Sequence, residues 1–422
     1  MTAAAVQPKV VLSNGQGLFS LRVAAAELAR RGRLHAFITA GYPTPSAMRL
    51  AGMIGRSLPA RLEGRRAAIP DDFVRPVWAS EVAYHLANAV RHLPGIGQIA
   101  ADGADLAGRF AYGRAAARLI RRIPVPPEGG VYHYRSGYGH ASVRIARARG
   151  YTTLCEHSIA HPAVLRYLVD HGGQLPLPGR AGPIDANWRS ILRDIGRADH
   201  VLVNSDFVAQ TFAHQGWPAD RVHMLYRGID DSFIDVLPVR TAPRGGALRL
   251  AFAGAFGRRK GADTLAAALA MLDDIDWRLD ICGPVEPGLD AESRGLLDDT
   301  RVRRHGVVGQ RELGARLGTT DIFVFPTLAE GSARVVFEAL AAGCYVITTP
   351  NAGSIVADGV HGAIVPPANA TALAAALRRA AANRAGLRAT GDANAALTRC
   401  DYSQRVYGDR LVALYDRLRA SP

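Results

Sequence analysis

The sequence predicts an α/β protein of two domains, each built on an open parallel sheet. Apolar runs of strand length alternate with amphipathic stretches of helical period along most of the chain, which is the pattern of βαβ units. A length of 422 residues exceeds what one hydrophobic core usually supports. A segment rich in proline and glycine interrupts the alternation once. We therefore expect two domains that face each other across a cleft, since open α/β sheets bind ligands beyond the carboxyl ends of their strands.

The first half, residues 1–236, is predicted to form the N-terminal domain. Its first strand is KVVLSN (9–14), which leads into the turn GQG and then into a helix over 20–32 that Gly32 is expected to end. Three further apolar runs predict strands at 130–136, 152–158 and 200–205, and the segment 221–230 closes this half.

A linker and a second domain follow. DVLPVRTAPRGGA (235–247) has no helical or strand period, which is typical of a linker. We place the linker at 237–246 and the C-terminal domain at 247–400. Its strands are predicted at 248–254, 277–283, 322–327 and 344–350. Residues 401–422 form an amphipathic helix that we expect to pack back toward the N-terminal domain.

Composition limits the partner and the compartment. A formal charge of +14 and an isoelectric point near 10.1 favour an anionic partner, such as a nucleotide phosphate, a lipid head group or nucleic acid. The four cysteines fall in apolar runs without CxxC spacing, so we expect free core thiols and a reducing compartment. No signal peptide or apolar run long enough to span a membrane is present, and the predicted location is the cytoplasm.

The stretch FPTLAEGSARVVFEALAAG (325–343) is the most informative part of the chain. It predicts a buried strand, a short loop and a helix that Ser332 is expected to cap. Backbone N–H groups at a helix start can hold an anion. Glu330 lies in the loop and Glu338 about two turns into the helix, and a carboxylate can accept hydrogen bonds from the two neighbouring hydroxyls of a ribose or a hexose. An isolated pair at this spacing is usually an ordinary surface pair, but the strand, loop and helix around it favour a site.

EGSARVVFE resembles the E-x7-E signature of the family 4 glycosyltransferases, which have the GT-B fold of two Rossmann-like domains. The similarity continues through the segments 248–265, 307–327 and 341–377, and in the first half through 198–230. It covers most of residues 195–400 and is weaker before residue 130.

The resemblance implies a retaining transfer of a sugar from a nucleoside diphosphate to an acceptor hydroxyl, in polysaccharide, lipopolysaccharide or glycolipid assembly. It implies that Glu338 binds the nucleotide ribose and that Glu330 contacts the donor sugar. The diphosphate is expected at Gly254 and at the backbone of Gly331, Ser332, Ala333 and Arg334. Lys260 is expected to pair with the diphosphate as charge grows on the leaving group. No metal and no cofactor beyond the donor are implied.

Lysine at position 260 is unusual in this chain. Among 51 lysines and arginines only Lys9 and Lys260 are lysines, and a compact ammonium suits phosphate pairing. Two departures from the family pattern accompany it. Ala255 replaces an arginine of the phosphate site, so either Arg258 or Arg259 would have to supply that charge. Arg334 stands where the family often has an apolar residue, either as a phosphate contact or pointing to solvent.

Four features of the first half are candidates for the cleft. Gly15 and Gly17 let backbone approach a ligand, although tight turns after strands are common. His157 resembles the family's histidine near the donor sugar and is preferred over His133 and His161. Ser205 and Arg227 end strands, where they either face the cleft or serve as turn or hinge residues.

Residues 46–123 mix arginine with large apolar side chains, and Arg114, Arg118, Arg121 and Arg122 lie near one helical face. Such a helix favours docking to an anionic membrane or to the acceptor; a solvated face of a core helix is the alternative. The membrane interpretation implies a lipid-linked saccharide acceptor and a peripheral position on the cytoplasmic face of the inner membrane.

Two rival functions stay open. One is another GT-B-like enzyme of the epimerase type, which the E-x7-E spacing disfavours. The other is a non-catalytic protein that binds a nucleotide or a polyanion. The sequence lacks RNA-recognition, zinc and helix-turn-helix patterns, so nucleic acid is not the expected partner.

Overall fold

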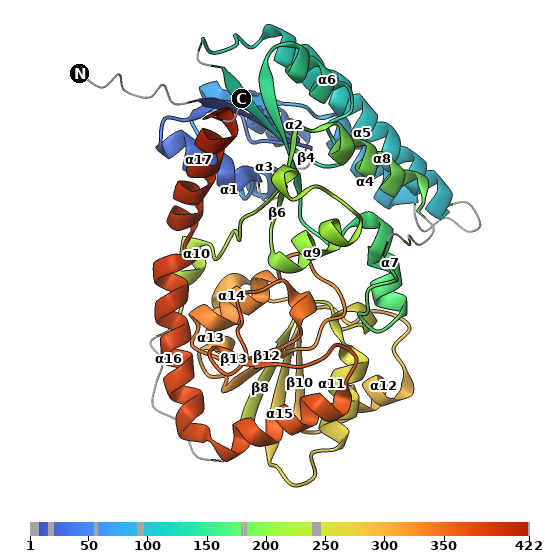
Figure 1. The fold of residues 1–422 in the computed structure, drawn as a ribbon, viewed down its shortest axis with the longest axis vertical. Coiled ribbons are helices and arrows are strands. Elements are labelled where there is room, and N and C mark those ends of the chain that lie inside the picture. The colour runs from blue at the N-terminus through green and yellow to red at the C-terminus, as the bar shows by residue number, and fades with distance from the viewer. Residues whose placement is uncertain are drawn as a thin grey trace.

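The computed structural model describes residues 8–15, 21–54, 58–90, 97–127, 129–178, 180, 184–238 and 246–420. Within them the chain forms two open sheets whose strands are all parallel, with orders β3-β2-β1-β4-β5-β6-β7 and β10-β9-β8-β11-β12-β13. Figure 1 shows the sheets one above the other. The strands are β1 (Lys9–Asn14), β2 (Leu34–Thr39), β3 (Val74–Pro76), β4 (Gly130–Arg135), β5 (Tyr151–His157), β6 (His200–Val203), β7 (Val222–Met224), β8 (Leu248–Ala253), β9 (Trp277–Cys282), β10 (Val302–Gly306), β11 (Ile322–Phe325), β12 (Tyr345–Thr348) and β13 (Gly362–Ile364).

Helices cover both faces of each sheet. They are α1 (Leu21–Arg30), α2 (Pro45–Ile54), α3 (Leu58–Glu63), α4 (Ala79–Val90), α5 (Gly97–Arg122), α6 (Ala141–Ala148), α7 (Pro162–Asp170), α8 (Ala186–Arg197), α9 (Asp206–His214), α10 (Asp231–Ile234), α11 (Ala262–Ala270), α12 (Ala291–Asp298), α13 (Gln310–Leu317), α14 (Arg334–Ala341), α15 (Ala370–Ala382), α16 (Arg384–Asp401) and α17 (Gln404–Ala420). Short 3₁₀ turns occur at η1 (Asp71–Phe73), η2 (Ala219–Arg221), η3 (Arg258–Lys260) and η4 (Pro350–Ala352).

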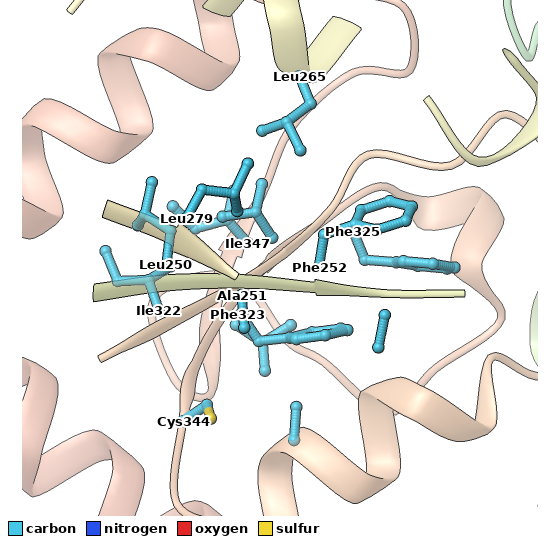
Figure 2. Close-up of a cluster of buried hydrophobic side chains, with 14 of the residues drawn as sticks. Leu250, Ala251, Phe252, Leu265, Leu279, Ile322, Phe323, Phe325, Cys344 and Ile347 are labelled. Atoms are coloured by element: carbon cyan, nitrogen blue, oxygen red, sulfur yellow. The ribbon is translucent and has the colours of Figure 1, made fainter. Parts of the chain in front are cut away.

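The core of the second domain lies on both faces of its sheet. Figure 2 shows Leu265 from α11 on one face and Cys344, before β12, on the other. Phe252 and Phe325 lie on neighbouring strands, with ring centroids 5.8 Å apart. Both side chains are fully buried, so the strand ends that carry the following loops rest on a rigid aromatic base.

The two faces of the first sheet have different cores. Residues of α5, α6, α8 and α9 share one buried cluster. Residues of α1 and α17 share another cluster with β1 and β2. The C-terminal helix therefore belongs to the N-terminal core, although it follows the second domain in sequence.

The chain crosses between the domains twice at one point. The Ile229 N–H donates to the carbonyl of Tyr402 at 2.9 Å. Gly228 has a φ of +72°, and a Cβ there would come within 2.1 Å of the Tyr402 oxygen. This position therefore requires glycine. Ion pairs of Arg31 with Asp409 and of Arg33 with Asp416 hold α17 against the first domain.

The predicted fold class is confirmed, and the predicted strands coincide with β1, β4–β6, β8, β9, β11 and β12 to within a few residues. The closing segment 221–230 contains the short strand β7. Sequence patterning missed β2, β3, β10 and β13, three of which are short or exposed. The expectation of four core thiols is wrong for Cys400, which is exposed, while Cys155, Cys282 and Cys344 are buried. Gly17 and linker residues 239–245 lie outside the described residues, and the domain boundaries stay predictions.

Replacing Leu411 of α17 should destabilise the first domain rather than the second. Leu411 is fully buried in the α1–α17 cluster, so Leu411→Ala should cost about 2–5 kcal/mol. Hydrogen exchange should show lost protection in β1 and β4, with β8 and β11 unaffected. Leu377 of α15 is equally buried in the second core. As the control, Leu377→Ala should reduce protection in β8 and β11 and leave β1 and β4 unaffected. Equal loss in both sheets after Leu411→Ala would contradict this assignment.

Candidate active site

The strand order places the candidate site. β8 lies next to both β9 and β11, so the connections that leave β8 and β11 run to opposite sides of the sheet. Ligands bind open parallel sheets at such a switch point, beyond the carboxyl ends of the strands. The β8 loop carries Lys260 and the β11 loop carries Glu330. Two residues separated by 70 positions are thereby brought together.

Lys260 and Arg259 converge on one carboxylate oxygen. Lys260 Nζ lies 2.8 Å from Glu330 Oε1, and Arg259 Nη1 lies 2.6 Å from the same oxygen. The Lys260 and Glu330 side chains are only 16% and 14% exposed. Lys260 Nζ also lies 5.1 Å from the centre of the Phe325 ring. We call Arg259, Lys260 and Glu330 the charge cluster.

Glycine makes room for the lysine. Gly254 has a φ of +129°, and a Cβ there would lie 3.1 Å from Lys260 Cδ. The lysine stem thus passes directly over the end of β8, which aims its ammonium at the β11 loop. Gly261, with a φ of +78°, lets the next turn pass within reach of the Pro326 carbonyl. These glycines explain why the stretch GAFGRRKG has its sequence.

The two arginines before Lys260 take different directions. Arg259 Nη1 also donates to the Ala329 carbonyl at 2.8 Å. Arg258 is exposed and reaches the Asp170 carbonyl of the first domain at 3.5 Å. Of the two candidates to replace the charge missing at Ala255, Arg259 is therefore the one that joins Lys260.

The start of α14 differs from the sequence expectation in one detail. The helix begins at Arg334 with Ala333 as its N-cap residue, so the interpretation of Ser332 as the cap is wrong. The Ala333 N–H donates to the Ala352 carbonyl at 3.0 Å and is thus already engaged. The amides of Gly331, Ser332 and Arg334 stay candidates for the diphosphate.

Glu338 is buried beneath Arg334. Arg334 Nε lies 3.0 Å from Glu338 Oε1, and its Nη1 lies 3.2 Å from Asp230 Oδ2. Arg227 approaches the same Asp230 carboxylate at 3.5 Å. Burial raises the pKa of Glu338, and Arg334 opposes that shift. Arg334 thus neither points freely to solvent nor lies unpaired.

The domains touch at Gly331. Ser205 caps α9 and donates its hydroxyl to the Gly331 carbonyl. A Cβ on Gly331 would lie 1.8 Å from the Ser158 carbonyl oxygen, so only glycine permits this approach. On the same side Asn351 Nδ2 donates to the Gly173 carbonyl at 2.7 Å. Ser205 is thus a cap and a cross-domain contact together.

Cavities lie on both sides of this contact. One, of about 280 Å³, is lined by the ends of β5, β6 and β7 together with Arg227, Ser332, Arg334 and Tyr407. The other, of about 540 Å³, lies between α7, the start of α8 and Arg259. Trp188 forms part of its wall. Arg259 therefore links the second cavity to the charge cluster.

His157 ends β5 and is almost completely buried. Its Nδ1 lies 2.9 Å from Ser136 Oγ, and its Nε2 has no hydrogen-bond partner among the residues described. Burial lowers its pKa to about 3, so the imidazole is neutral near neutral pH. The next residue, Ser158, touches Gly331, which brings this strand end to the cleft. His133 instead contacts Tyr415 in the core, and His161 caps α7.

Gly15 has a packing role. A Cβ there would fall 1.8 Å from a ring carbon of Tyr138, and its carbonyl accepts a hydrogen bond from Ser80 at 2.7 Å. The absence of a side chain is thus explained by a neighbouring ring. Its predicted role at the donor stays a prediction.

Sequence reasoning missed three residues of the site: Asp230, Asn351 and Ser158. Asp230 ends the segment YRGID, directly after a strand and a glycine turn. This position could have identified it as a candidate site residue. Asn351 and Ser158 contribute through contacts with the other domain, which no local pattern reveals.

The arrangement of two facing open parallel sheets, with cations and a carboxylate at a switch point, defines the GT-B class of glycosyltransferases. Two family models match the chain: "Glycosyltransferase Family 4" over residues 77–233 and "Glycosyl transferases group 1" over residues 247–383. The chain thus carries a family 4 glycosyltransferase domain in its first half and a group 1 glycosyl transferase domain in its second. It has the GT-B fold and is a transferase.

Solved structures show the same fold. Sucrose-phosphate synthase from Thermosynechococcus elongatus is 19% identical with a TM-score of 0.67, covering 99% of this chain and 100% of that chain. A glycosyltransferase from Rickettsia africae is 14% identical with a TM-score of 0.63, covering 99% and 100%. HepE from Anabaena, solved with UDP, is 16% identical with a TM-score of 0.62, covering 96% and 99%. HepE has also been solved with UDP and glucose and with UDP-glucose. A search of curated proteins finds no match.

Membrane-spanning helices and metal-binding clusters are both absent among the described residues. No helix among them is long and apolar enough to cross a bilayer. No group of three or more His, Cys, Asp or Glu side chains among them is arranged to hold a metal ion. The aspartates of DDID (273–276) are exposed.

Arg259→Ala should impair turnover far more than Arg258→Ala. Removing a preorganised cation from a site of developing charge costs on the order of 10²-fold in rate, and of the two arginines only Arg259 contacts Glu330. Steady-state kinetics with a sugar nucleotide would measure both variants. The two variants are a matched pair because each replaces one of two adjacent arginines by alanine. Equal effects would show that the geometry does not decide between them.

Stability should fall as the pH drops from 7 to 5. Burial lowers the pKa of His133 to about 4 and that of His157 to about 3, whereas the unfolded chain has a histidine pKa of about 6.5. The unfolded state thus binds more protons below that pH, and each histidine should cost about 2 kcal/mol at pH 5. Urea unfolding at both pH values measures this loss.

His133→Asn should lose less stability between the two pH values than the wild type. The exposed His171 provides the control, and His171→Asn should keep the full pH dependence. If His133→Asn and wild type lose the same amount, His133 does not resist protonation in the folded protein.

Proposed function

We propose that the protein is a retaining glycosyltransferase that moves a sugar from a nucleoside-diphosphate sugar to an acceptor hydroxyl. The observation that carries the proposal is the charge cluster: Lys260 and Arg259 meet at one oxygen of Glu330 at the switch point. These cations neutralise the carboxylate. A bound diphosphate supplies a second anionic partner within the same loops. Retention of the anomeric configuration rests on the family resemblance alone.

The reaction follows from the placement of these charges. The bond between the anomeric carbon and the diphosphate oxygen breaks, and its electron pair stays on the phosphate. The acceptor oxygen forms a bond to the anomeric carbon and loses its proton to a phosphate oxygen or to solvent. Lys260 and Arg259 stabilise the charge that accumulates on the leaving diphosphate. Glu330 holds the cations in place and lies where the donor sugar is expected.

The ribose would bind at Glu338. A buried carboxylate beside a cavity accepts hydrogen bonds from two neighbouring hydroxyls. Because the HepE structures contain UDP or UDP-glucose, a uridine diphosphate hexose is the first donor to test. No metal or further cofactor is proposed, so activity should survive EDTA.

The acceptor would enter the cavity of about 540 Å³ beside Arg259. Trp188 offers an aromatic face on which a sugar ring can stack, and Arg166 and Asp170 offer polar contacts. We propose a saccharide or a lipid-linked saccharide of polysaccharide, lipopolysaccharide or glycolipid assembly. A lipid-linked acceptor would place the enzyme in the cytoplasm, peripherally on the inner membrane.

Glu330→Gln and Lys260→Ala should each lower transfer by on the order of 10²-fold or more. Release of nucleoside diphosphate, measured with and without acceptor, is the assay, and NMR of the product gives the anomeric configuration. Controls are Lys9→Ala, which changes the other lysine, and Glu292→Gln, which changes an exposed carboxylate of α12. Both controls should keep wild-type activity, and all four should unfold at nearly the wild-type temperature.

Three outcomes would count against the proposal. Isomerised donor without transfer would favour the epimerase-type alternative. Tight polyanion binding with no release of nucleoside diphosphate would favour a non-catalytic binding protein. Loss of folding in both site variants would return Glu330 and Lys260 to structural roles.

A further inference from the structure

One face of the first domain is strongly cationic. Helices α5, α6 and α8 all pack their apolar sides into the same cluster on one face of the sheet, so their outer sides form one surface. Figure 1 shows these helices side by side. We call this surface the arginine face; its members, all exposed, are Arg114, Arg118, Arg144, Arg189, Arg193 and Arg197.

Carboxylates of the described residues do not neutralise these arginines. Within the described part of the chain, none of the six forms an ion pair with a carboxylate, whereas the nearby Arg109 and Arg147 pair with Asp105 and Asp199. Six uncompensated guanidinium groups on three adjacent helices make a strong local positive potential. Such a surface favours an extended anionic partner.

An apolar stripe borders the arginine face. On α4 and just before it, Trp78, Val82 and Leu86 recur every four residues and are 38%, 64% and 56% exposed. This spacing places them along one side of the helix. Large apolar side chains exposed in a row mark an interaction surface more often than isolated ones do.

The stripe and the arginines turn to the same side of the molecule. Helices α4 and α5 pack against each other where Gly108 makes room for Ala83; a Cβ on Gly108 would come within 2.3 Å of the Ala83 Cβ. Val82 precedes Ala83, and the line through Ala107, Arg114 and Arg118 begins one residue before Gly108. In each helix the exposed line is therefore rotated by about 100° around the helix axis, in the direction of lower residue numbers, from the side that contacts the other helix. Because α4 and α5 run antiparallel, the same rotation in each helix places both exposed lines on the same side of the helix pair.

We propose that this combined surface, the arginine face with the α4 stripe, docks on an anionic lipid bilayer. Guanidinium groups pair with lipid phosphates in a bidentate manner. Apolar side chains on the same side can enter the boundary between head groups and acyl chains. A nucleic acid would use the arginines but leave the apolar stripe exposed to water, so the lipid surface accounts for both features.

The surface leads to the proposed acceptor cavity. Trp188, in the wall of that cavity, is followed on α8 by Arg189 of the arginine face. Arg259 forms the far wall and contacts Glu330. A lipid-linked acceptor held at the bilayer would therefore have its saccharide near the charge cluster. This step, unlike the docking itself, depends on the proposed transferase function.

Co-sedimentation of the full chain with sucrose-loaded vesicles tests the docking. We expect binding to vesicles containing phosphatidylglycerol and at least 10-fold weaker binding to pure phosphatidylcholine, with the anionic binding reduced by salt. Arg114→Gln, Arg118→Gln and Arg193→Gln combined should reduce binding at least 10-fold. Val82→Ser with Leu86→Ser should also reduce it, including the part that resists salt.

A matched variant gives the control. Arg303→Gln, Arg304→Gln and Arg311→Gln remove the same charge from exposed positions around β10 in the other domain, and should bind as the wild type does. If both triple variants lost vesicle binding equally, the net charge of the protein would explain the binding, and the proposal would be overturned. Retained binding after the serine changes, or tighter binding to a DNA duplex than to vesicles, would overturn it too. Because all variants keep the charge cluster, turnover of a soluble acceptor separates this failure from failure of the proposed function.

Discussion

The Glu330 carboxylate is the interaction on which the site depends. Two cations within 3 Å of one oxygen would repel each other strongly without it, because they lie in a part-buried region where water screens poorly. The positive φ angles of Gly254 and Gly261 and the Phe325 ring beneath the ammonium all serve to aim Lys260 at this carboxylate. The result is a preformed cationic surface, which needs little rearrangement when a diphosphate arrives.

Close backbone contact between the domains fixes where ligands can lie. Gly331 meets Ser158 and Ser205 with no room for a side chain, so the two domains are in direct contact here. Space remains on either side, as the cavity beside Arg334 and the cavity beside Arg259. The charge cluster borders the second cavity through Arg259, whereas Glu338 of α14 pairs with Arg334, which lines the first. A donor that spans both glutamates must pass the start of α14 between them.

Local patterns were sufficient for the fold and insufficient for the pairings. Alternating strand and helix periods predicted two parallel sheets, although they missed β2, β3, β10 and β13, and the strand, loop and helix around Glu330 indicated the candidate site. These features depend on neighbours in sequence. The choice of Arg259 over Arg258 depends on the path of η3, and the pairing of Arg334 with Asp230 joins residues 104 positions apart. Neither leaves a periodic signal. Ser332 matched the usual preference for a helix cap, but the Ala333–Ala352 hydrogen bond shifted the helix start by one residue.

Arg334 resolves a conflict that the fold itself creates. If Glu338 binds a ribose as we propose, its burial creates a conflict, because burial raises its pKa and favours the protonated form, which is a poorer acceptor. The Arg334 guanidinium at 3.0 Å favours the ionised form, and Asp230 at 3.2 Å prevents Arg334 from becoming an unbalanced charge in its turn. If ribose hydroxyls replaced Arg334 on Glu338, Asp230 would still hold the guanidinium at the start of α14. Under the proposed function, this arginine, which is absent from the family pattern, would prepare the ribose site and then add charge to the phosphate site.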